Sequence, residues 1–218
     1  MLGIGNTAEV VEYEHRKVCK LFFEGYPPKY VEHEYQNAKE IFRLGLRVPE
    51  PFGLVTIDQR QGIIYERVDG EPLFNQRKNI NIVELLDMFT HIHRGWLEHH
   101  SNNVLSYKEY LSIMIQNRRA NCRDLIEEIY TLPDDNCLLH GDFHPDNVLV
   151  RLSDGMPIVI DFMNVCHGPA LFDIARTFFL LCQIDKSLAN KYLKKMQVSK
   201  IDIAQYVKVI EQCRQYEI

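Results

Sequence analysis

The chain has 218 residues, 46% of them hydrophobic and 25% charged, which excludes a disordered protein. Its formal net charge of -5 provides no basic field that would attract nucleic acid or an anionic membrane. The longest apolar stretch, 171–182, contains Asp173 and Arg176 and is shorter than the roughly 20 residues that a membrane span needs. Six cysteines without close paired spacing, and no signal-peptide pattern, predict a cytoplasmic protein with reduced thiols. Neither nucleic acid nor membrane is expected as a partner, and the pattern gives no oligomeric state.

The first third of the chain predicts a small antiparallel sheet with one helix. Aliphatic and aromatic residues favour strands over 8–13 and 18–23. A helix is predicted from the prolines at 27–28 to residue 44, because Gly45 and two later prolines end it. Two further strands, 51–57 and 62–67, flank a polar turn at 58–61.

The rest of the chain is predicted to be mainly helical. Asn81 can cap one helix, and Ser106 with Glu109 forms a capping box for another. Short strands are predicted at 137–139, 148–152 and 157–160, and the last helix carries Ile201, Ala204, Val207 and Ile210 on one face. Residues 68–72 are the best linker between an N-terminal lobe, 1–68, and a helical C-terminal lobe, 69–218.

The strongest chemical signal is the run His-Gly-Asp-Phe-His-Pro-Asp-Asn at 140–147, followed by a short hairpin and Asp161. A carboxylate at Asp142 can accept the proton of an attacking hydroxyl. The amide oxygen of Asn147 and the carboxylate of Asp161 are hard ligands that suit Mg²⁺ on nucleotide phosphates. The spacing H-x-D-x-x-x-x-N also matches the catalytic loop of kinases.

The same run allows two other interpretations. In the first, Asp142 and Asn147 only cap backbone groups of a polar turn. In the second, His140, Asp142, His144 and Asp161 bind the metal of a hydrolase, which leaves Asn147 unexplained. Four further histidines, at 91, 93, 99 and 100, lack metal-site spacing and are predicted to lie on helix surfaces.

The N-terminal region contains residues that fit a phosphate site. A glycine-rich turn with Gly3, Gly5, Asn6 and Thr7 lies between strands, where backbone N–H groups can approach phosphate oxygens. Taken alone, an ordinary glycine hairpin explains this turn equally well. Lys20 lies inside a strand and Glu34 on the apolar side of the helix, so a Lys20–Glu34 ion pair explains both positions.

The motifs H-G-D-F-H-P-D-N-V-L-V, I-D-F and G-P-A-L-F-D-I-A closely resemble the aminoglycoside phosphotransferase and choline-kinase-like families. The resemblance covers roughly residues 2–176. It implies an α+β, protein-kinase-like bilobal fold with ATP between a small antiparallel-sheet lobe and a mainly helical lobe. It also implies that Asp142 is the catalytic base, that Asn147 and Asp161 hold Mg²⁺, and that Asp173 braces the catalytic loop. Residues 65–72 resemble the family's hinge, so the backbones of Glu66 and Val68 are expected to contact adenine.

The predicted activity is transfer of the ATP γ-phosphoryl group to a hydroxyl of a small molecule. Family members act on aminoglycosides, macrolides, choline, sugars and amino acids, so the acceptor stays open. The glycine turn begins at Gly3, which leaves almost no residues for a preceding strand, and Ala8 stands where protein kinases have a third glycine. The alternative is therefore a nucleotide-binding regulator with poor catalysis, and a pure interaction module is a third class.

Overall fold

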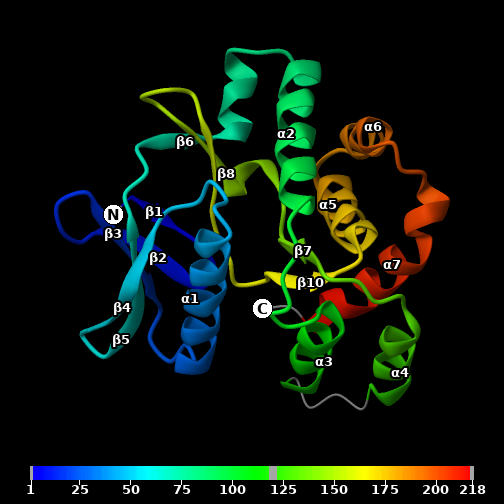
Figure 1. Ribbon diagram of the computed structural model, residues 1–218, viewed down its shortest axis with the longest axis horizontal. Helices are drawn as coiled ribbons and strands as arrows, with labels where there is room; N and C mark the ends of the chain where they lie inside the picture. The colour runs from blue at the N-terminus through cyan, green and yellow to red at the C-terminus, as the bar shows by residue number, and fades with distance from the viewer. Residues whose placement is uncertain (1, 118–121, 217–218) are drawn as a thin grey trace. The chain divides into compact units, whose positions relative to one another are not determined.

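The computed structural model describes residues 2–117 and 122–216 (Figure 1). These residues form two compact units. The first unit contains the described residues up to Pro72 together with Asn147–Met163, and the second contains the remaining described residues. The lobe boundary expected after residue 68 stays a prediction.

The first unit is built on a five-stranded antiparallel sheet in the order β1-β2-β3-β5-β4. Its strands are β1 (Gly3–Ile4), β2 (Ala8–Glu12), β3 (Lys17–Phe22), β4 (Pro51–Ile57) and β5 (Arg60–Glu66). Asp58 and Gln59 form the turn between β4 and β5 and have φ angles of 47° and 65°. Positive φ at both central residues is typical of the tight turn that joins twisted strands. The predicted turn at 58–61 is therefore shorter, because Arg60 and Gln61 pair with β4.

Helix α1 (Pro28–Arg43) packs against β4 and β5 (Figure 1). Its first residue is a proline, whose missing N–H has no partner in a first turn anyway. The residue after its C-cap, Gly45, has a φ of 80°, the left-handed conformation that commonly ends a helix. The buried face includes Val31, Glu34 and Ala38, so the predicted helical face is confirmed.

A second, three-stranded sheet in the same unit has the order β6-β8-β9. It consists of β6 (Gly70–Pro72), β8 (Val148–Arg151) and β9 (Pro157–Val159). Residues 70–72 were expected inside a linker, but their backbone pairs with β8. A Cβ at Gly70 would lie 2.9 Å from the carbonyl oxygen of Val150, so this pairing needs a glycine. The sheet places residue 147 before β8 and residue 160 after β9.

The second unit is mainly helical. Its helices are α2 (Ile82–Leu97), α3 (Tyr107–Asn117), α4 (Arg123–Thr131), α5 (Ala170–Ile184), α6 (Lys186–Met196) and α7 (Lys200–Cys213). Short 3₁₀ turns occur at Leu73–Lys78 and Arg214–Tyr216. Both predicted capping boxes are confirmed, Asn81 with Glu84 before α2 and Ser106 with Glu109 before α3.

Helix α5 packs against α6 and α7 and forms the centre of this unit. The predicted apolar face of α7 is only partly buried, because Ile210 is 1% exposed whereas Ile201 is 87% exposed and Ala204 is also exposed. The buried face carries Ile203 and Tyr206, two residues further along, and it points toward α5. Strand β7 (Cys137–Leu139) pairs with β10 (Cys166–Gly168), a strand that the sequence pattern did not predict. Among the residues that the structure describes, no helix is both long and apolar enough to cross a membrane.

Candidate active site

The glycine-rich turn of the first unit closes between β1 and β2. The N–H of Gly5 donates to the carbonyl oxygen of Ala8 at 2.8 Å, and Asn6 and Thr7 lie between them. Gly3 was expected in this turn, but it pairs with β2 and forms half of β1. A Cβ at Gly3 would lie more than 4 Å from any described atom other than those of its chain neighbours. The hairpin itself therefore does not require a glycine at this position.

Lys20 extends from β3 to the two carboxylates nearest to it. Its ammonium nitrogen lies 2.8 and 2.9 Å from the two carboxylate oxygens of Glu34 and 2.9 Å from Oδ1 of Asp161. The predicted Lys20–Glu34 ion pair is confirmed. Burial disfavours the charge of Lys20, but attraction by Asp161 and Glu34 outweighs it and raises the pKa of the ammonium well above its ordinary value. Lys20 is therefore a fixed positive charge at neutral pH.

The exposure of the three side chains differs. Glu34 is 1% exposed, Lys20 17% and Asp161 42%. The hydroxyl of Tyr65 donates to Glu34 at 3.4 Å, which provides a second polar contact for this buried carboxylate. The Glu34 side of the cluster is thus sealed in the unit, whereas the Asp161 side is open to solvent.

Asn147 and Asp161 lie at the same end of the β8–β9 hairpin. Val148 pairs with Val159, and the N–H of Ile160 donates to the carbonyl oxygen of Asn147 at 2.9 Å. Asp161 follows directly and has a φ of 70°, an uncommon left-handed conformation outside glycine. Strained residues of this kind concentrate at functional sites. The hairpin therefore brings the backbones of residues 147 and 160 together, next to Asp161. A shared ion at Asn147 and Asp161 stays a prediction.

The predicted hinge leaves the end of β5. The N–H of Glu66 donates to the carbonyl oxygen of Glu50 at 2.9 Å. Val68 lies in the irregular segment 67–69 and is partly exposed. The Glu66 N–H is thus already hydrogen-bonded within the first unit.

Asp142 belongs to the second unit and lies between two histidines of the same loop. One of its carboxylate oxygens is 3.6 Å from Nε2 of His144, and its N–H donates to Nδ1 of His140 at 3.3 Å. Burial alone would raise the pKa of Asp142. The hydrogen bond and charge of His144, followed by the charges of Arg176 and His140, outweigh burial and lower the pKa below its ordinary value. The side chain is 28% exposed and is a carboxylate at neutral pH.

Asp173, at the first turn of α5, holds the backbone that precedes Asp142. Its two carboxylate oxygens accept the N–H groups of His140 at 2.9 Å and Gly141 at 2.8 Å. This contact agrees with the bracing expected from the family resemblance. His140 is fully buried and stacks edge-on against Trp96, so it has the packing position that was predicted for it.

The position of Gly141 has no room for a side chain. Its φ is 74°, and a Cβ there would lie 2.3 Å from the carbonyl oxygen of Asn164, a distance that real Cβ atoms essentially never show. The Asn164 side chain accepts a hydrogen bond from the Tyr110 hydroxyl at 2.7 Å, which fixes this neighbour. The glycine at the second position of the motif is therefore a steric requirement of the loop.

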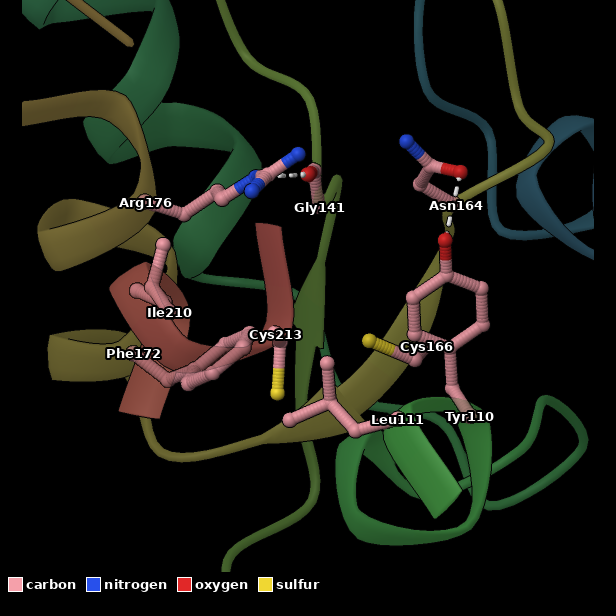
Figure 2. Close-up of a pocket in the computed structure, with 9 residues that line it drawn as sticks. All are labelled: Tyr110, Leu111, Gly141, Asn164, Cys166, Phe172, Arg176, Ile210 and Cys213. Atoms are coloured by element: carbon pink, nitrogen blue, oxygen red, sulfur yellow. Dashed lines mark hydrogen bonds between the residues drawn. The ribbon is translucent and has the colours of Figure 1, made fainter. Parts of the chain in front are cut away.

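Figure 2 shows a small cavity beside Gly141, with Arg176 and Asn164 at one end and apolar and cysteine side chains at the other. Its volume is about 10 Å³, which is the room of about one water molecule. Arg176 donates from Nε to the carbonyl oxygen of Gly141 at 3.2 Å. The cavity is too small for a small-molecule acceptor.

Two of the residues that touch the catalytic loop were not predicted to do so. In the sequence pattern, Arg176 is only a charge that interrupts an apolar stretch. His93 was expected on a helix surface, but it is fully buried and lies 3.1 Å from Asp173. The spacing held a signal, since residue 93 follows Phe89 by four and precedes Trp96 by three, which places it on the apolar face of α2. His91 is exposed on α2, as expected, whereas His99 and His100 follow the end of the helix, so the helix-surface prediction is wrong for them.

The described residues contain no group of three or more His, Cys, Asp or Glu side chains arranged to hold a metal ion. Mg²⁺ requires less, because it is usually bound through one or two protein oxygens together with waters and substrate phosphates. One carboxylate and one amide at a hairpin end fit that smaller requirement.

Comparison with known proteins identifies the family. The profile of the phosphotransferase enzyme family matches residues 2–197, and no curated protein matches the chain. One similar solved structure is an aminoglycoside-3'-phosphotransferase of type VIII, with a TM-score of 0.65 and 16% identity over 89% of this chain and 84% of that one. Another is an aminoglycoside phosphotransferase from Streptomyces rimosus in complex with ADP and streptomycin, with a TM-score of 0.61 and 11% identity over 89% and 85%.

A Plasmodium vivax ethanolamine kinase is also similar, with a TM-score of 0.54 and 15% identity over 92% of this chain and 64% of that one. At these identities the structural likeness shows the fold, and the predicted α+β, protein-kinase-like fold is confirmed. The profile match confirms the predicted class of enzyme. Because the match covers nearly the whole chain, this protein belongs to the phosphotransferase enzyme family.

Proposed function

We propose that this protein transfers the γ-phosphoryl group of ATP to a hydroxyl of a small molecule, as a Mg²⁺-dependent kinase. The observation that carries the proposal is the position of Lys20, whose ammonium contacts Glu34 on α1 and Asp161, 141 residues away in the sequence, at 2.8–2.9 Å. A sealed carboxylate on one side and an exposed one on the other hold a positive charge at a fixed place. Such a charge suits the phosphates of a nucleotide.

The nucleotide would be held by three parts of the first unit. The turn between Gly5 and Ala8 presents backbone N–H groups, and phosphate oxygens can approach them because Gly5 has no side chain. Lys20 provides the positive charge. The carbonyl of Glu66 and the backbone of Val68 provide polar groups for adenine, since the Glu66 N–H is already bonded to Glu50.

Asn147 and Asp161 are the residues that would hold Mg²⁺, which supplies charge neutralisation on the phosphates when bound. Asp161 is the more exposed of the two carboxylates at Lys20, so it can exchange its present partner for a ligand. Glu34 then continues to neutralise Lys20. The different roles of Glu34 and Asp161 explain why Lys20 has two acidic partners.

Asp142 would accept the proton of the acceptor hydroxyl. Its lowered pKa keeps it ionised at neutral pH, so it can accept a hydrogen bond from the hydroxyl and hold it in position. The low pKa also makes it a weak base, which suits phosphoryl transfer, where positioning and charge stabilisation contribute more than proton transfer.

The test is a phosphoryl-transfer assay with Mg·ATP over a panel of aminoglycosides, choline, ethanolamine, sugars and amino acids. Asp142→Asn should lower kcat by about 10²- to 10⁴-fold, the usual contribution of an acid–base group, and leave the Kd of ATP within about twofold. Asp146→Asn, the same change at an exposed position of the same loop, is the matched control and should keep full turnover.

Full turnover by Asp142→Asn would remove this residue from the mechanism. Titration calorimetry with Mg·ATP separates the remaining outcomes. Tight binding without transfer to any acceptor would favour the catalytically poor regulator, and no binding would favour an interaction module.

A further inference from the structure

Helix α5 holds the catalytic loop on both sides of Asp142. Asp173 accepts the two N–H groups that precede this residue. One helical turn later, the hydroxyl of Thr177 donates to the carbonyl oxygen of Phe143 at 2.9 Å. Side chains four residues apart lie on the same face of a helix, so one face of α5 fixes the backbone directly before and directly after Asp142.

Side chains of two other helices extend the contacts of Asp173. Nε2 of His93, from α2, lies 3.1 Å from the Asp173 carboxylate. The hydroxyl of Tyr192, from α6, lies 2.8 Å from Nδ1 of His93. Three buried side chains are therefore linked in series, and we call them the loop-holding network: Asp173, His93 and Tyr192.

The proton positions in the loop-holding network follow from donor and acceptor chemistry. The Asp173 carboxylate only accepts, so Nε2 of His93 carries the proton that it donates to this carboxylate. In the neutral imidazole Nδ1 is then an acceptor, and the Tyr192 hydroxyl donates to it. The imidazole is thus fixed in one tautomer by a bond at each nitrogen.

All three side chains of the loop-holding network have zero solvent exposure. Burying polar groups is unfavourable unless every one of them is hydrogen-bonded, and apolar residues would fill the same space without this demand. His93 also contacts the loop by stacking, because its ring lies nearly parallel to that of Phe143 with centroids 4.1 Å apart. His93 thus contacts Phe143 directly, and it acts on His140 and Gly141 through Asp173.

We propose that His93 is a positioning residue for phosphoryl transfer, which acts through Asp173 to hold the backbone on which Asp142 is mounted, with Tyr192 fixing its tautomer. This inference rests on the proposed function. A misplacement of about 1 Å at a reacting group can lower a rate by about 100-fold, so the network would act on kcat and leave nucleotide binding unchanged.

His93→Phe and His93→Gln separate the hydrogen bond from the packing. The phenyl ring keeps the volume and the stacking on Phe143 but has no N–H, whereas the glutamine amide can still donate to Asp173. His91→Phe, an exposed position on the same helix, is the matched control. Tyr192→Phe removes only one hydroxyl and is the milder variant. If His93→Phe does not fold, Tyr192→Phe tests whether these side chains position the catalytic loop.

Two quantities are measured for each variant. The first is kcat and KM for Mg·ATP, with an acceptor from the panel or with water as acceptor. The second is hydrogen exchange of the His140 and Gly141 amides, relative to the amide of Tyr206, which is buried in α7. A general loss of stability would change both exchange rates together, whereas loss of the Asp173 orientation changes the loop amides alone.

His93→Phe should lower kcat about 10- to 100-fold with KM for ATP within about twofold, and should speed exchange of the two loop amides about tenfold relative to Tyr206. His93→Gln should restore most of both, and Tyr192→Phe should show a change in the same direction of about threefold. Equal kcat or equal loop exchange in His93→Phe and His91→Phe, or no recovery in His93→Gln, would overturn the proposal. If the wild type transfers no phosphoryl group, the proposed function fails by itself and the exchange measurement alone decides the role of His93.

Discussion

Lys20 in the first unit holds two polar partners and Asp173 in the second holds three, and their surroundings differ. Lys20 holds two carboxylates, and one of these, Asp161, is 42% exposed. Asp173 holds two backbone N–H groups and a histidine, all of them buried. An open cluster can exchange a partner for a ligand, whereas a sealed one fixes geometry. The cluster around Lys20 is therefore suited to binding a ligand, and the cluster around Asp173 is suited to fixing the backbone of the catalytic loop.

We expect the largest loss of stability at the buried cluster around Asp173. Asp173→Ala leaves two backbone N–H groups and the N–H of His93 without an acceptor in a dry interior, so we expect a loss of about 4 kcal/mol in the free energy of unfolding. Urea denaturation measures this loss. Asp124→Ala, at an exposed position of α4, should lose no more than about 1 kcal/mol, and equal losses would contradict the comparison.

Lys20→Met tests the open cluster. Glu34, 1% exposed, would lose its cation, and we expect a loss of about 3 kcal/mol at neutral pH. Lys17→Met, on the same strand with an exposed ion pair to Glu14, should lose no more than about 1 kcal/mol.

The pH dependence of Lys20→Met has a definite sign. Burial already raises the pKa of Glu34 and Lys20 opposes this, so removing Lys20 raises the pKa further. The folded state then takes up a proton that the unfolded chain, with a pKa of about 4.3, does not bind. The deficit relative to wild type should therefore shrink as pH falls through the raised pKa of Glu34 toward about 4.3. A deficit that grows over this window would show that Glu34 is not the group left unpaired.

Gly141→Ala tests how tightly the catalytic loop of the second unit is packed. We expect a loss of about 2 kcal/mol or more, because the new Cβ adds a clash with Asn164 to the strain of a positive φ. Gly155→Ala has a similar φ of 71° and no neighbour within 4 Å of a Cβ, so it should lose only about 1 kcal/mol. Equal unfolding midpoints for the two variants would show that the contact with Asn164 relaxes without penalty.

Asn81→Ala is expected to have the smallest effect. It removes the cap of α2, the helix that carries His93, at an exposed site, and should lower the free energy of unfolding by about 1 kcal/mol. Turnover should not change, because the cap lies at the far end of the helix from His93. A fall in kcat that matches His93→Phe would mean that any weakening of α2 disturbs the loop.

Local patterns predicted well wherever one residue or a short spacing decides the outcome. The capping boxes at Asn81 and Ser106, the end of α1 at Gly45 and the hairpin before Asp161 all depend on contacts within a few residues. The Lys20–Glu34 pair was also predicted, because a charge on the apolar face of an element demands a partner.

Predictions failed where the surroundings of an element decide its exposure. The pattern placed Ile201 and Ala204 on the buried face of α7, whereas the packing of this helix, mainly against α5, buries Ile203 and Tyr206 instead. His93 was misplaced because a histidine suits either a surface or a buried polar network. Strand β10 was missed because three residues carry too short a pattern for a periodicity to appear.

The sequence by itself determined the family, a sheet-rich first part followed by a mainly helical one, and the candidate residues for phosphoryl transfer, because a fixed spacing of acids and an amide can be recognised without coordinates. The tertiary structure alone decided that Asp161 shares Lys20 with Glu34 and that His93 and Tyr192 extend the network behind Asp173. These contacts join residues 80 to 141 positions apart. Each depends on which buried polar groups face one another after the helices and strands have packed.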